Sequence, residues 1–163
     1  MKELLDKLSS YNLFNYLLPG IIFAVLSEKL TSSSFIQQDI ILGVFIYYFI
    51  GLVISRIGSL IIEPFLKWTS FVHFAEYSEF LSASATDQKL DLLSEANNMY
   101  RTFCSLFLLI LIMKGYEEIS MIYPFIDKWK SIILLIGLLF LFLLSYRKQT
   151  KYITQRITKT ITN

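Results

Sequence analysis

Cysteine and histidine are almost absent from this chain of 163 residues, which contains one of each. The single cysteine, Cys104, excludes an intramolecular disulfide, and its apolar neighbours predict that it packs as a small hydrophobic residue. His73 has no cysteine, histidine or paired carboxylates at metal-ligand spacing around it. We therefore expect no metal ligands in this chain and an ordinary surface or interfacial role for His73.

The motifs of common enzyme classes are also missing. The chain has no phosphate-binding glycine loop, no H-E-x-x-H zinc motif, no C-x-x-C and no G-x-S-x-G nucleophile elbow. Carboxylates are absent from the centres of the apolar runs, where ionisable groups mark proton pathways. Arg56 and Glu63 lie seven residues apart on one helix face, and we interpret them as anchors at the membrane interface. The sequence thus predicts no catalytic residue, no cofactor and no enzymatic activity.

Charge is scarce as well. Charged residues make up 17% of the chain and hydrophobic residues 55%, whereas soluble domains have about 25% charged residues. The apolar residues fall in four blocks separated by charge clusters, which is typical of membrane spans. We predict an all-α membrane protein, a single domain over residues 1–163, with four transmembrane helices at about 11–26, 40–62, 102–115 and 130–146. No signal-peptide cleavage site follows the first block, so the first span is expected to remain in the mature protein.

The first two spans carry helix breakers and glycines. Pro19 and Gly20 interrupt span 1, and such a break within a membrane requires neighbouring protein to satisfy the backbone. Residues 1–8 are predicted to form an interfacial helix before it. Span 2 is predicted to begin at an Asp39 cap and to continue as one helix into the cytoplasm, with a kink or an end at Pro64. Three glycines on one face of span 2 are predicted to contact other copies in a homo-oligomer: Gly43, Gly51 and Gly58.

The distribution of lysine and arginine predicts the orientation. The N-terminal segment, the middle segment and the tail carry eleven of these residues and the other loops carry four. Both termini should therefore lie in the cytoplasm, beneath a bacterial inner membrane that the chain crosses several times. The tail, residues 147–163, is basic and has no acidic residue. We expect it to bind anionic lipid rather than nucleic acid, through Arg147, Lys148 and Lys151.

The segment between spans 2 and 3, residues 67–100, is predicted to form a cytoplasmic helical hairpin. Apolar residues recur at helical spacing over residues 71–81, and a second helix begins after a turn at residues 82–87 and runs directly into span 3. Acidic residues outnumber basic ones in this segment. They form either a solvated helix face or a surface that binds a basic cytoplasmic protein. The predicted partner-binding residues are Glu76, Glu79, Asp91 and Glu95.

The layout resembles that of small membrane proteins from bacterial defence operons. The kinked first helix carries NYLLPG, from Asn15 to Gly20, and the long second helix carries ISRIGSLIIEPFLK, from Ile54 to Lys67. With the cytoplasmic hairpin, this layout is similar to the membrane subunit of the Kiwa anti-phage system, and the resemblance covers most of the chain. It implies a protein that detects phage at the envelope and works with a cytoplasmic DNA-binding effector.

Two functions remain after these exclusions. The first is a non-enzymatic, oligomeric inner-membrane subunit that senses a membrane event such as phage infection and signals to a cytoplasmic partner encoded nearby. The alternative is an oligomeric membrane pore or channel effector. A pore requires a polar stripe along a whole span, and span 1 comes nearest to one, with Asn12, Asn15 and Ser27. A third class, an enzyme acting on lipid, lacks candidate residues.

Overall fold

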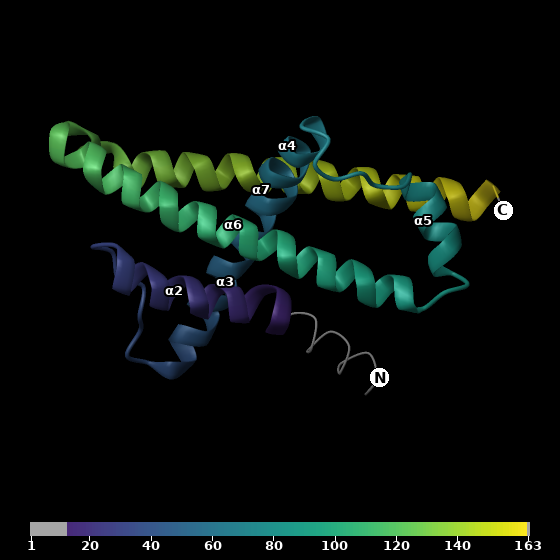
Figure 1. The fold of residues 1–163 in the computed structure, drawn as a ribbon, viewed down its shortest axis with the longest axis horizontal. Helices are drawn as coiled ribbons and strands as arrows, with labels where there is room; N and C mark the ends of the chain where they lie inside the picture. Colours follow the sequence, from purple (N-terminus) through teal and green to yellow (C-terminus); the bar gives the residue numbers. More distant parts are fainter. Residues whose placement is uncertain (1–12, 163) are drawn as a thin grey trace.

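The computed structural model describes residues 13–162, and every regular element in this range is helical (Figure 1). The prediction of an all-α fold is confirmed for this part of the chain. The interfacial helix predicted at residues 1–8 lies outside the described residues. In chain order the elements are the π-helix η1 (Leu13–Leu17), α2 (Leu18–Leu30), α3 (Ile40–Ile57), the π-helix η2 (Gly58–Ile62), α4 (Glu63–Trp68), α5 (Tyr77–Ser84), α6 (Lys89–Ile122) and α7 (Phe125–Thr162).

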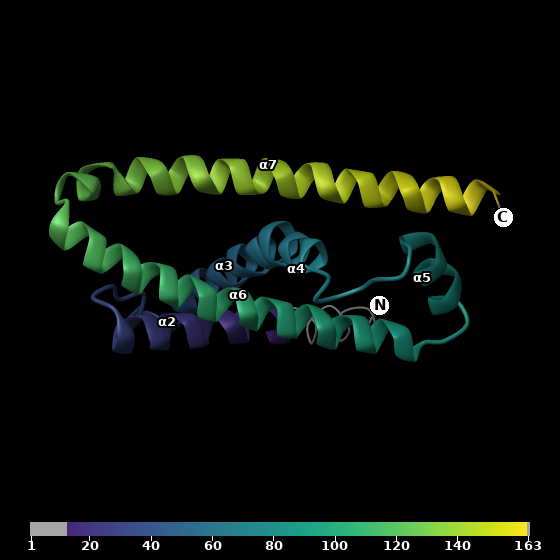
Figure 2. The same cartoon turned by 45° about the horizontal axis from the view of Figure 1, so that its top comes forward.

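Two long helices determine the shape of the molecule. α6 and α7 run antiparallel from a turn at residues 123–124 and diverge as they leave it (Figure 1). The continuous helix formed by α3, η2 and α4 passes between them, and α2 lies on the side of α6 (Figure 2). α5 contacts both long helices near their separated ends.

The buried core is small and lies where α2, α3 and α6 meet. Its fully apolar part consists of Phe23, Ile54, Leu106 and Ile110. The prediction that the broken first span contacts other protein is confirmed, because α2 packs against both α3 and α6. The residues that α2 buries are Pro19, Gly20, Phe23, Ala24 and Ser27.

Within residues 13–162, two helices are long and apolar enough to cross a membrane. They are Ile40–Trp68, which comprises α3, η2 and α4, and Phe125–Lys159 within α7. Only 22% and 11% of their most apolar stretches are buried within the chain. The core helix of a soluble protein would bury most of such a surface, so the outward apolar faces support membrane association.

The prolines in α2 and α4 each follow a π-helical turn. Pro19 follows η1, and Pro64 follows η2. Proline has no N–H group, and its ring clashes with the carbonyl four residues earlier in an α-helix, a conflict that the wider π turn relieves. From the sequence, Pro64 is predicted either to kink the second helix or to end it. The structure shows that the helix continues through this point and ends at Trp68.

The helix predicted over residues 71–81 is wrong in its first half. Two residues after the end of α4, Ser70 has a φ of 58°. The next N–H, of Phe71, donates to the carbonyl of Leu66 in α4 at 2.9 Å. A left-handed residue with such a bond closes the C-terminus of a helix. The chain then has no regular structure as far as Glu76, whose N–H donates to the side chain of Glu79 at 3.3 Å and thereby starts α5.

The second helix of the middle segment runs directly into the third apolar block, as predicted. α6 starts where the Lys89 N–H donates to Asp87 Oδ1 at 2.9 Å, and it continues without a break to Ile122.

The basic tail continues the last helix. α7 is unbroken from Phe125 to Thr162 and so contains the fourth apolar block and nearly all of the tail. Its last turns are held against α5, because Lys159 Nζ donates to Ser78 O and Ser82 Oγ. The ring centroids of Tyr77 in α5 and Tyr152 in α7 also lie 5.0 Å apart.

Candidate functional site: a buried ion cluster between three helices

Glu63 lies at the point where three helical segments meet, and its side chain is only 9% exposed. It forms ion pairs with a cation from each segment: Lys67 in α4 at 3.1 Å, Arg101 in α6, and Lys148 in α7 at 3.6 Å. The predicted anchoring of Glu63 at the membrane interface stays a prediction, and the structure adds these ion pairs within the chain. A buried carboxylate is stable only with charged partners, and here partners from separate helices surround it.

The position of Lys148 follows from the π turn before Pro64. Within η2 the Glu63 N–H donates to the carbonyl of Gly58, and Pro64 has no N–H to offer the next carbonyl. Lys148 Nζ takes that place, donating to Ser59 O at 2.7 Å and to Ser59 Oγ at 2.8 Å. Pro64 thus leaves the carbonyl of Ser59 without a backbone donor, and Lys148 of α7 supplies one. These hydrogen bonds hold α7 against η2.

The cluster has more positive than negative charge. Glu63 carries one negative charge and its three partners carry three positive charges, so the net charge is +2. The side chains of Arg101 and Lys148 are only 18% and 25% exposed. The Nε of Arg101 is buried and finds no acceptor within the described part of the chain. Uncompensated, partly desolvated cations attract an anion.

A cavity of about 1080 Å³ opens from this cluster between the diverging helices. Its wall includes five cations and two carboxylates, which with neutral His73 gives a net charge of +3. Aromatic side chains cover the α5 side. The charged residues of the wall are Arg56, Lys67, Arg101, Lys148, Lys151, Glu63 and Glu76.

The three residues predicted to bind lipid lie in different surroundings. Lys148 belongs to the ion cluster, whereas Arg147 is exposed on α7 and lies outside the cavity wall. Lys151 is exposed and lines the cavity one turn further along α7. Their binding to lipid stays a prediction. The structure adds that Lys148 and Lys151 face a common cavity with cations from α3, α4 and α6.

The four acidic residues predicted to bind a partner are all exposed. Asp91 and Glu95 lie one turn apart on α6, outside the cavity wall. Glu76 and Glu79 flank the start of α5, where Glu79 accepts the hydrogen bond that caps the helix. Partner binding by these residues stays a prediction, and only Asp91 and Glu95 can test it without disturbing a helix cap.

The glycines of the second helix lie at contacts within the chain. A Cβ atom on Gly51 would be 1.8 Å from Tyr16 O, and one on Gly58 would be 2.6 Å from Ser105 Oγ. A Cβ atom on Gly43 would meet the ring of Tyr47 at 3.2 Å. The predicted contact with other copies is untested. Within a single chain, Gly51 lets α3 approach η1 closely, and Gly58 lets η2 approach α6.

Cys104 is exposed, and its predicted packing as a buried hydrophobic residue is wrong for the single chain. On α6, the neighbouring residues Thr102, Ser105 and Leu106 take the buried positions instead. His73 is exposed, as predicted for an ordinary surface histidine, and forms part of the cavity wall. Among the described residues there is no group of three or more side chains that could hold a metal ion.

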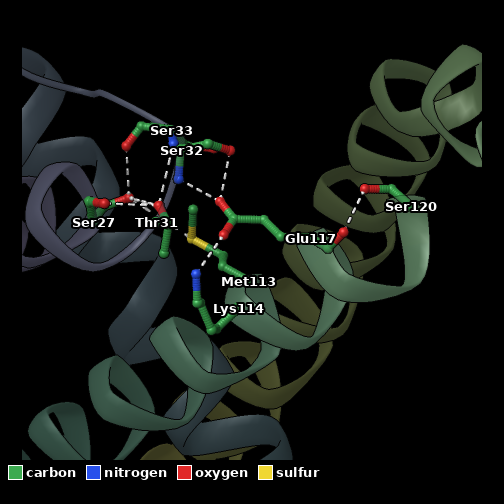
Figure 3. Close-up of polar contacts among 8 residues, drawn as sticks. All are labelled: Ser27, Thr31, Ser32, Ser33, Met113, Lys114, Glu117 and Ser120. Carbon is green, nitrogen blue, oxygen red and sulfur yellow. Dashed lines mark hydrogen bonds and ion pairs between the residues drawn. The ribbon is translucent and has the colours of Figure 1, made fainter. Parts of the chain in front are cut away.

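A second polar cluster joins the α2–α3 loop to α6 near its turn into α7 (Figure 3). Glu117 accepts hydrogen bonds from the N–H of Ser32 and, at 2.7 Å, from Ser32 Oγ. The other carboxylate oxygen of Glu117 lies 3.2 Å from Lys114 Nζ. These bonds from Ser32, with a smaller contribution from Lys114, hold the pKa of the Glu117 carboxyl below its ordinary value.

Replacement of Glu117 by glutamine should remove a pH dependence of stability. Because the folded-state pKa of Glu117 is lowered, its stabilisation is complete above the ordinary carboxyl pKa. It is lost as the pH falls through the lowered folded-state pKa. We expect the unfolding temperature of Glu117→Gln to fall less than that of the wild type over this acidic range. Glu118→Gln, at the neighbouring exposed position, is the control, and equal acid profiles for wild type and Glu117→Gln would contradict the assignment.

Comparison with known proteins gives no relative from which a role could be transferred. No protein-family model matches the chain, and neither a curated protein nor a solved structure matches it. The described residues therefore define a class only: a helical protein with two candidate membrane helices, both of which contribute residues to a buried ion cluster.

Proposed function

We propose that this protein is a non-enzymatic, oligomeric subunit of a bacterial inner membrane that responds to a membrane event and signals to a soluble cytoplasmic protein. In this arrangement the four spans are the α2 region, α3 with η2, residues 102–115 of α6 and residues 130–146 of α7. Both termini are cytoplasmic, in line with the excess of lysine and arginine on that side. The resemblance in layout to the Kiwa membrane subunit supports antiviral defence as the setting, with phage infection as the event.

One observation carries this proposal: α6 and α7 each join an apolar segment to a polar segment without a break. In α6 the polar residues 89–101 precede the apolar block, and in α7 the tail from residue 147 follows it. An unbroken helix moves as one rigid body, so a displacement of its apolar segment within the membrane also displaces its polar segment. The Glu63 cluster connects α6 and α7 to α4 near the ends of their apolar segments.

Reversal of two exposed charges on α6 tests the cytoplasmic partner. We expect Asp91→Lys with Glu95→Lys to reduce recovery of the neighbouring-gene product about tenfold in a pull-down, because like charges would face a basic partner. Both residues are exposed and lie outside the cavity wall, so the unfolding temperature should fall only slightly, through the loss of an acidic side chain from the first turn of α6. The matched control is Glu28→Lys with Glu118→Lys, which makes the same charge change on the opposite side of the proposed membrane. Unchanged recovery with the α6 variant would contradict the partner surface.

The mass of the detergent-extracted complex separates this proposal from the pore. We expect a defined oligomer that carries a stoichiometric soluble protein when the chain is purified with the product of its neighbouring gene. An oligomer that lacks a soluble protein and conducts ions in planar bilayers would overturn the proposal in favour of a channel.

A further inference from the structure

We propose that the cavity beside the Glu63 cluster binds the phosphate group of an anionic phospholipid headgroup. The inference rests on the proposed membrane placement for the source of the phosphate, and on the described side chains for the chemistry. The residues assigned to the anion are Arg56, Lys67, Arg101, Lys148 and Lys151.

The charge of the cavity wall calls for an anionic ligand. Glu63 neutralises only one of the three cations that surround it, and Arg56 and Lys151 add two more positive charges to the wall. Glu76 lies on the α5 side of the cavity and leaves the net charge at +3. Arginine and lysine close together in a partly desolvated wall are the donors that phosphate oxygens prefer.

Arg101 contributes positive charge to the part of the cavity wall nearest Glu63. Its NH1 group donates to Glu63, and its side chain is only 18% exposed. Its Nε is buried and closed to a ligand in the cavity, so Arg101 acts on an anion through its charge rather than through this donor. The hydroxyl groups of Ser55 and Ser59 also line the cavity.

The level of the cavity favours a lipid as the source of the phosphate. Glu63 directly follows the span formed by α3 and η2, Arg101 directly precedes that of α6, and Lys148 comes shortly after that of α7. In a membrane these three positions share the depth of the headgroups, where basic pockets between helices bind anionic lipid. A cavity of about 1080 Å³ also has room for more than an inorganic phosphate ion.

Lipid titration of the purified full-length protein tests the proposal. Micelles doped with phosphatidylglycerol should raise the unfolding temperature of the wild type, whereas phosphatidylcholine should not. Arg56→Gln with Lys151→Gln should weaken the apparent affinity about tenfold or more, because it removes two of the five cations of the cavity wall. Neither residue belongs to the Glu63 cluster, and an unchanged unfolding temperature in phosphatidylcholine verifies that the variant folds.

The matched control is Lys89→Gln with Lys128→Gln, which removes the same charge from exposed positions outside the cavity wall. If both double variants weaken binding equally, the effect is general electrostatics and the proposed site is wrong. If inorganic phosphate stabilises the wild type as much as phosphatidylglycerol, lipid as the source is overturned. The titration needs no partner protein, so its failure is distinguishable from loss of the partner in the pull-down.

Discussion

Replacement of Gly51 by alanine is expected to separate α3 from the first helical segment and to lower the free energy of unfolding by about 3 kcal/mol or more. A Cβ atom at this position would lie 1.8 Å from Tyr16 O. The contact is reciprocal, since a Cβ atom on Gly20 would lie 1.7 Å from Tyr47 O. Both obstructing atoms belong to the backbone, so no side-chain rotation relieves the overlap and the helices must move apart.

The matched control for this prediction is Gly137→Ala in α7. Apart from the neighbouring backbone of α7 itself, no described atom lies within 4 Å of a Cβ built on Gly137, so the added methyl group meets open space. Alanine is favoured over glycine in a helix by roughly 1 kcal/mol, and we expect this variant to be as stable as the wild type or slightly more stable. Thermal unfolding in one detergent measures both variants. Equal unfolding temperatures for Gly51→Ala and Gly137→Ala would contradict the close approach of the two helices.

The same variant separates a contact within the chain from one between copies. If Gly51 acts only inside the chain, the loss of stability in Gly51→Ala should not depend on protein concentration. A glycine that contacts another copy would give a loss that shrinks as concentration rises, because association follows mass action. A concentration-independent loss together with an unchanged oligomer would remove Gly51 from the predicted assembly surface.

Local features of the fold could be predicted from the sequence because their signals lie close together in the chain. Asp39 was predicted to cap the second helix, and its Oδ1 accepts the Leu42 N–H at 2.8 Å. The continuation of the second helix of the middle segment into the third apolar block was also predictable, since apolar spacing persists across the boundary. The helix start at Tyr77 was not, because the spacing of the aromatic residues before it also fits a chain without regular structure.

The ion cluster could not be predicted because its members lie far apart in the sequence. Arg101 is 38 residues from Glu63, and Lys148 is 89 residues from Ser59. Apolar periodicity places helices but not the angle at which they cross, and the crossing decides which charges meet. A usable signal existed: Glu63, next to Pro64 at the end of an apolar block, has one local partner in Lys67, and its burial requires further cations from elsewhere in the chain.

Replacement of Glu63 by glutamine should lower the free energy of unfolding by about 3–5 kcal/mol, the usual cost of breaking a buried ion pair from one side. The amide oxygen can still accept a hydrogen bond, but Lys67, Arg101 and Lys148 are then left without a negative charge among them. Unfolding in a neutral detergent measures the loss, with the exposed Glu118→Gln as control. An unfolding temperature equal to that of the control would contradict the role of Glu63 in joining the three helices.

Removal of one cation should recover part of that loss and thereby identify its cause. Lys148→Met alone should also destabilise the protein, because Ser59 O then loses the donor that replaces the missing N–H of Pro64. If repulsion among cations causes the defect of Glu63→Gln, the double variant should lose less than the sum of the two single losses, by about 1–3 kcal/mol. Strictly additive losses would instead show that Glu63 acts through packing.

Phosphatidylglycerol should stabilise Glu63→Gln more than the wild type, since the variant leaves a third uncompensated positive charge for the headgroup to neutralise.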